Sequence, residues 1–178
     1  MAETPQAAGF DFPPAALRTD PASPNNNRVI EPEDEPIIAA YLEAATAQNL
    51  MFSEWPLNAR NPVLVGAPFT PELLEGFEVG VANRTDLNHV LDVSEGLTAR
   101  PYVIDDDDGD PSRAIVWDCQ IDATFWKDVD TGEKAPPGGG YPNVGAPGVE
   151  VGTSTELVLR DGRWLVNSGA AEERACDG

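Results

Sequence analysis

The sequence predicts an α+β domain, with helices in its first half packed on one face of a curved antiparallel sheet. Apolar residues recur at helical spacing over about 33–49 and 70–81. From about residue 97 the pattern changes to the alternation that is typical of strands, and Asp161–Gly162 is a strong hairpin signal. Helices followed by hairpin-connected strands indicate this class rather than an alternating α/β fold.

The chain has 178 residues, which is the size of one domain with an extension. Residues 1–32 are rich in Pro, Ala and Asn and show no periodicity, so we predict a disordered linker or stalk. The folded domain is then expected to span 33–178.

Two helices are expected. The first begins near Glu33, where acidic residues meet the positive end of the helix dipole, and fades at Gln48–Asn49. The second begins at Thr70–Pro71, because threonine caps a helix and proline is tolerated in its first turn. The apolar faces of the two helices carry Ile37, Ile38, Tyr41, Leu42 and Ala45, and Leu73, Leu74, Phe77 and Val81.

The strands are predicted at Tyr102–Ile104, Ile115–Phe125, Thr153–Arg160 and Arg163–Asn167, with an irregular tail from Ser168 to Gly178. In the longest strand, Ile115, Trp117, Cys119, Ile121, Ala123 and Phe125 share one face. We expect this apolar face to be buried and Asp118 and Asp122 to be solvated. In the alternative, the polar face lines the interior, and burial raises the pKa of Asp118 so that it can act as an acid or base. The path of the glycine-rich loop 135–148 does not follow from the sequence.

The charge is strongly acidic. Thirty-one acidic residues against eleven basic ones give a net charge of -20. Such a surface does not neutralise phosphates, so nucleic acid and anionic membranes are excluded as partners. No apolar run is long enough to span a membrane, and we expect a signal segment to lie outside this chain.

Cys119 and Cys176 are the two cysteines, one inside a strand and one in the tail. A disulfide between them would close a loop of nearly sixty residues, worth about 4 kcal/mol in the chain-entropy estimate. Two free thiols or a redox pair are the alternatives, although redox pairs usually show C-x-x-C spacing. The disulfide would indicate an oxidising compartment.

Several strings in the second half are distinctive: AIVWDC over 114–119, DVDTGE over 128–133 and LVLRDGRWLV over 157–166. With Cys176 and the order of elements, they resemble the nuclear transport factor 2-like superfamily, which includes ketosteroid isomerases, scytalone dehydratases and polyketide cyclases. The nearer resemblance is to extracytoplasmic, often lipid-anchored, actinobacterial proteins of that superfamily. It covers about 33–178 and implies a cystatin-like cone at the bacterial cell surface.

Two titratable residues are candidate catalytic groups. His89 is the one histidine, and Asp86 or Asp92 could hold its tautomer for general-base catalysis. Asp118 is the candidate carboxyl inside the cone. A lone histidine at a helix end is more often a surface or capping residue, and Asp118 is expected to be solvated. We therefore predict no catalytic role for either residue.

No metal site is predicted. Aligning Gly109 of the acidic run Asp105–Asp110 with the glycine of an EF-hand loop places Ile104 and Ile115 at the first and last ligand positions, so the template fails.

These observations favour a non-catalytic, extracytoplasmic domain that binds a small apolar molecule or a cell-envelope protein, without a cofactor, as a monomer or homodimer. The aromatic residues expected to line its core or pocket are Tyr41, Phe77, Trp117, Phe125 and Trp164. The alternative is an enzyme of the isomerase, dehydratase or cyclase kind that uses Asp118 or His89.

Overall fold

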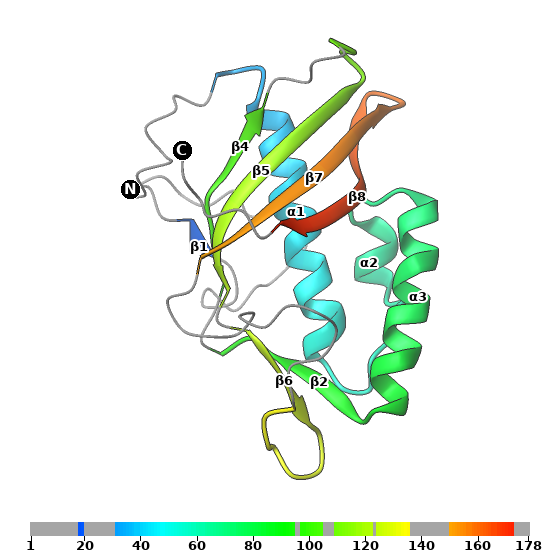
Figure 1. The fold of residues 1–178 in the computed structure, drawn as a ribbon. Coiled ribbons are helices and arrows are strands. Elements are labelled where there is room, and N and C mark those ends of the chain that lie inside the picture. Colours follow the sequence, from blue (N-terminus) through cyan, green and yellow to red (C-terminus); the bar gives the residue numbers. More distant parts are fainter. Residues whose placement is uncertain are drawn as a thin grey trace.

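The computed structural model describes residues 18–19, 31–94, 97–104, 109–122, 124–135 and 150–172. Within these ranges the chain is an α+β protein of helices and mainly antiparallel sheets (Figure 1). The helices are α1 (Glu35–Ser53), α2 (Pro62–Gly66) and α3 (Pro71–Asp86). None of the described helices is long and apolar enough to cross a membrane.

The main sheet has the strand order β1-β3-β5-β7-β8, with β4 also paired to β5. Its strands are β1 (Arg18–Thr19), β3 (Leu97–Ala99), β4 (Pro101–Ile104), β5 (Arg113–Asp122), β7 (Glu150–Arg160) and β8 (Arg163–Glu172). All neighbours are antiparallel except β1 and β3, which are parallel. A separate antiparallel pair joins β2 (His89–Asp92) to β6 (Phe125–Asp128).

Two local signals act as the sequence predicts. The Thr70 side chain accepts a hydrogen bond from the Leu73 N–H at 3.3 Å and caps α3. At the β7–β8 turn, Asp161 and Gly162 both have positive φ values, 53° and 77°. A two-residue turn with both φ values positive matches the twist of the two strands, so the hairpin prediction is confirmed.

Two predicted strand boundaries were wrong, and a short strand lies within the predicted linker. β8 continues to Glu172, through part of the tail that we expected to be irregular. Arg18–Thr19, within the predicted linker, forms a short strand on β3. The long strand ends at Asp122, and Phe125 belongs to the separate β2–β6 pair. The alternation of apolar and polar residues continues from β5 into β6, so the sequence pattern does not show where the first strand ends. The acidic run 105–108 and loop residues 136–149 lie outside the described residues, as does most of 1–32.

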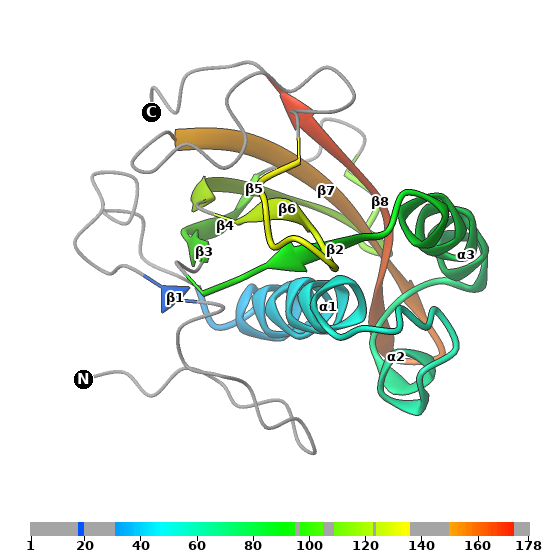
Figure 2. The ribbon, with the colours of Figure 1, turned by 90° about the horizontal axis from the view of Figure 1, so that it is seen from below.

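The face of β5 that packs on α1 is the opposite of the predicted one. Ala114, Val116 and Asp118 on this inner face are 4%, 0% and 0% exposed, whereas Ile115 and Trp117 are half-buried. Cys119 on the outer face is also fully buried, so the outer face of the strand is covered at that position. The alternation of apolar and polar residues therefore does not reveal which face of β5 meets the helices. Successive side chains of a strand point to opposite faces, so an assignment that is wrong by one residue is wrong for every side chain. Figure 2 shows α1 running along the inner side of the curved sheet, with α3 beside β8.

Candidate functional site

A cavity of about 320 Å³ lies between α1, α3 and the inner face of the sheet. Helix α1 contributes one wall, α3 and the segment before it the second, and strands β5, β7 and β8 the floor. Its lining residues are Tyr41, Ala44, Ala45, Gln48, Asn49, Phe69, Leu73, Phe77, Gln120, Thr153, Thr155, Val166 and Gly169. A cavity of this size accommodates a small organic molecule.

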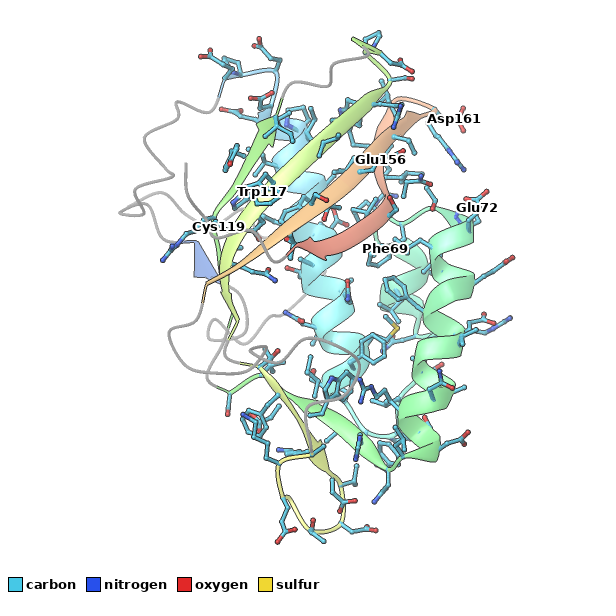
Figure 3. The ribbon with its side chains drawn as sticks, in the orientation of Figure 1. Phe69, Glu72, Trp117, Cys119, Glu156 and Asp161 are labelled. Carbon is cyan, nitrogen blue, oxygen red and sulfur yellow. The ribbon has the colours of Figure 1, made fainter. Side chains whose placement is uncertain are left out.

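The lining is apolar on one side and polar on the other. Phe69, Leu73 and Phe77 form the apolar side, and Figure 3 shows Phe69 between β8 and α3. Hydroxyl and amide side chains from α1, β5 and β7 form the polar side. None of the described lining residues carries a formal charge at neutral pH. The site therefore suits an uncharged, amphipathic molecule.

Small residues create the space. Ala44 and Ala45 occupy the α1 wall where larger side chains would reach the sheet. On the floor, Gly169 lies opposite Thr155 in the β7–β8 register. A Cβ at position 169 would stand 3.5 Å from the Thr155 hydroxyl oxygen, which is ordinary contact, so glycine leaves volume open rather than relieving a clash.

A chain of edge-to-face aromatic contacts supports the apolar side. Ring centroids of Phe69 and Phe77 are 5.0 Å apart, those of Phe77 and Phe52 6.4 Å, and those of Phe52 and Trp126 5.5 Å. The Arg84 guanidinium lies 3.9 Å from the centroid of the Trp126 ring. Such pairs stabilise a fixed ring geometry, so the Phe77 ring is held in place from both sides.

Behind the polar side lies a buried carboxyl. The Tyr41 hydroxyl donates to Asp118 Oδ2 at 2.7 Å, and the Arg100 backbone N–H donates to Asp118 Oδ1 at 2.5 Å. Burial raises the pKa of Asp118 to about 6, against the lowering effects of these hydrogen bonds and of the Arg100 charge. Burial, followed by the neighbouring Asp118 charge, holds the pKa of Tyr41 well above its usual value. The prediction that Asp118 is solvated is wrong.

The structure brings two of the five predicted aromatic residues to the cavity, Tyr41 and Phe77. Trp117, Phe125 and Trp164 are not among the described residues that line it. Trp164 packs against the hydrophobic core, and Phe125 lies on β6 with the Lys134 ammonium 4.9 Å from its ring centroid.

His89 is also away from the cavity. It begins β2, opposite Asp128 on β6, and its Nδ1 is buried without a hydrogen-bond partner among the described residues. The Asp92 carboxylate is bound instead by the Lys127 ammonium at 2.7 Å and by Ser94. The described residues therefore give His89 no carboxylate of the kind a general base requires.

Cys119 is fully buried in β5 (Figure 3), and Cys176 lies outside the described residues, so the disulfide stays a prediction. Among the residues that the structure describes, no group of three or more His, Cys, Asp or Glu side chains could hold a metal ion.

The polar residues of the lining were not predicted from the sequence. Gln48 and Asn49 follow Tyr41 by seven and eight positions, so they continue the apolar face of α1 with polar side chains. Polar residues at positions where a helix faces its core are a recognisable signal of an internal cavity. Thr153 and Thr155 carry the same signal on the inner face of β7.

No protein-family model and no curated protein matches this chain. Among solved structures, the chain is similar to the intermembrane space region of the chloroplast protein ARC6. The identity is 15%, the alignment covers 81% of this chain and 97% of that one, and the TM-score is 0.49. This similarity is too low to carry an argument about function.

Proposed function

We propose that this protein is a non-catalytic binding domain for a small, uncharged, amphipathic molecule held between α1, α3 and the sheet. The cavity of about 320 Å³ is the observation that carries the proposal. Its apolar side supplies the contact area from which most binding free energy comes, and its hydroxyl and amide groups orient the ligand. This refines the small apolar ligand predicted from the sequence, because half of the lining is polar.

Binding of 2-naphthol tests the proposal, since it is uncharged at pH 7 and combines an aromatic body with one polar group. We expect a dissociation constant in about the millimolar range or lower, because a ligand of this kind gains roughly 0.3 kcal/mol of binding free energy per non-hydrogen atom. Equilibrium dialysis measures it. The matched anion 2-naphthalenesulfonate should not bind, because the described lining offers no cation and the net charge is -20.

A variant that fills the cavity locates the binding. Ala45→Phe places a ring in the space beside α1 and should abolish 2-naphthol binding. Ala82→Phe makes the same change at an exposed position of α3 and should leave binding intact. Equal loss in both variants, or no binding by the unaltered protein, would contradict the proposal.

A second candidate, an acid–base enzyme of the isomerase, dehydratase or cyclase kind, is favoured by Asp118. This carboxyl, with its pKa raised to about 6, is not among the described residues that line the cavity, but it accepts a hydrogen bond from one of them, Tyr41. Hydrogen–deuterium exchange at the α-carbon of 2-tetralone in D2O, followed by NMR, tests it. The binding proposal predicts no acceleration over buffer, whereas an acceleration that Asp118→Asn removes would favour the enzyme.

The nuclear transport factor 2-like cone and the extracytoplasmic location are also part of the proposal. A helix lying along the inner side of a curved sheet, with a cavity between them, supports the cone. The location depends on the Cys119–Cys176 disulfide. Whether the domain also binds a cell-envelope protein, and whether it is a monomer or homodimer, stay predictions.

A further inference from the structure

Two hydroxyl groups at one end of the cavity donate hydrogen bonds to Asp118. Tyr41 donates its proton to Asp118 Oδ2 at 2.7 Å, and Thr153 Oγ1 donates to the Asp118 backbone carbonyl over a long 3.4 Å and is also hydrogen-bonded to Tyr41. Both side chains line the cavity. A hydroxyl has one proton and two lone pairs, so an engaged hydroxyl offers a ligand only an acceptor.

Asp118 fixes this arrangement because its carboxylate has no proton to give. An ionised carboxylate only accepts hydrogen bonds, so the Tyr41 hydroxyl must be the donor. The Arg100 N–H occupies the other carboxylate oxygen, and Asp118 is 0% exposed, so bulk water does not replace Tyr41 as the donor to this carboxylate. The Arg100 side chain, 6% exposed, supplies the opposite charge nearby and favours the ionised form.

The opposite end of the α1 wall has different chemistry. Asn49 is eight residues beyond Tyr41, about 12 Å further along the helix at about 1.5 Å per residue. It also lines the cavity, and its Nδ2 has no hydrogen-bond partner among the described residues. Amide side chains can both donate and accept, so the Asn49 end does not discriminate between ligands as the Tyr41 end does.

We propose that the cavity selects ligands carrying an O–H or N–H donor, which Tyr41 Oη and Thr153 Oγ1 accept while Phe69, Leu73 and Phe77 hold the apolar body. The ligand class is thus an uncharged aromatic or alicyclic alcohol, phenol or amide N–H compound. This inference rests on the proposed function and makes Tyr41 the specificity-determining residue of the site.

Three ring compounds test the selection at pH 7.5: 2-naphthol, 2-methoxynaphthalene and naphthalene. The second lacks the donor and is slightly larger, and the third lacks it and is smaller, so size is bracketed. Equilibrium dialysis should show 2-naphthol bound about fivefold more tightly than either, the effect of one net hydrogen bond. Naphthalene is more hydrophobic than 2-naphthol, so a preference for 2-naphthol means that the hydrogen bond outweighs this difference in hydrophobicity.

Variants assign the preference to the two hydroxyls. Tyr41→Phe and Thr153→Val each remove one acceptor and should each reduce the preference at least about twofold. Tyr102→Phe is the matched control on β4, outside the described lining, and should retain it. Circular dichroism and the thermal midpoint establish that each variant is folded.

The outcomes separate the inference from the proposed function. Equal binding of all three compounds by the unaltered protein, or tighter binding of 2-methoxynaphthalene, overturns the inference and leaves the binding proposal standing. Binding of none overturns both. A preference that survives in the Tyr41→Phe, Thr153→Val double variant also overturns the inference.

Discussion

Replacing Asp118 by asparagine should change how the stability of the protein depends on pH. Asparagine keeps the size of the side chain but does not ionise; its Nδ2 replaces one acceptor oxygen by a donor, and the Tyr41 hydroxyl can turn to accept from it. In the folded protein, burial raises the pKa of Asp118 from 3.8 to about 6. The folded state therefore holds this proton more tightly than the unfolded state, and the carboxyl must ionise in a buried site as the pH rises.

The sign and size of the effect follow from linkage. Because the folded-state pKa is the higher one, the free energy of unfolding falls between about pH 4 and pH 6 and is unaffected by this group above that window. The pKa difference corresponds to about 3 kcal/mol, at about 1.4 kcal/mol per pKa unit. Urea unfolding from pH 4 to pH 7.5, followed by tryptophan fluorescence, measures it.

Repulsion among the carboxylates of a chain with net charge -20 also lowers stability as the pH rises, but it acts on both proteins alike. The difference between the unaltered protein and Asp118→Asn therefore isolates Asp118. Asp161→Asn, at an exposed turn, is the control and should follow the unaltered protein. If the Asp118→Asn curve runs parallel to the unaltered one between pH 4 and pH 6, the buried-carboxyl account is refuted.

Other substitutions test the packing and the disulfide. Tyr41→Phe removes a donor to buried Asp118 and should cost about 1–3 kcal/mol of unfolding free energy at pH 7; a loss below about 0.5 kcal/mol would argue against this hydrogen bond. Thr70→Ala removes the α3 cap and should cost about 1 kcal/mol in urea unfolding. Leu157→Ala, at a fully buried residue, should cost about 2–5 kcal/mol. Leu159→Ala, at a residue 38% exposed, should cost far less. Equal losses of unfolding free energy in the two variants would contradict the position of the core described above. Mass spectrometry of the non-reduced protein should find it two hydrogens lighter than the reduced form, and Cys119→Ser should abolish that difference; two free thiols would count against an oxidising compartment.

The local signals in the sequence predicted local structure well. The Thr70–Pro71 cap and the Asp161–Gly162 hairpin each depend on the backbone preferences of one or two residues, and both are present. The α+β class followed from the change of period near residue 97. These features need no knowledge of distant contacts.

The site depended on distant contacts, which the sequence did not supply. Tyr41 meets Asp118 across 77 residues of chain. The face of β5 that packs on α1 was misassigned because the outer face carries the half-buried Trp117 and the fully buried Cys119, and these apolar residues obscured the inner position of Asp118. The useful signal was polar residues where a buried face was expected, at Asn49 on α1 and Thr155 on β7.

NMR mapping of 2-naphthol on the isotopically labelled protein shows where the ligand binds. We expect backbone amide shifts to change at cavity residues such as Ala45, Thr153 and Val166, and Ala45→Phe to suppress these changes. Shifts confined to the outer face of β5, at Ile115 and Trp117, would contradict a ligand site between α1, α3 and the sheet.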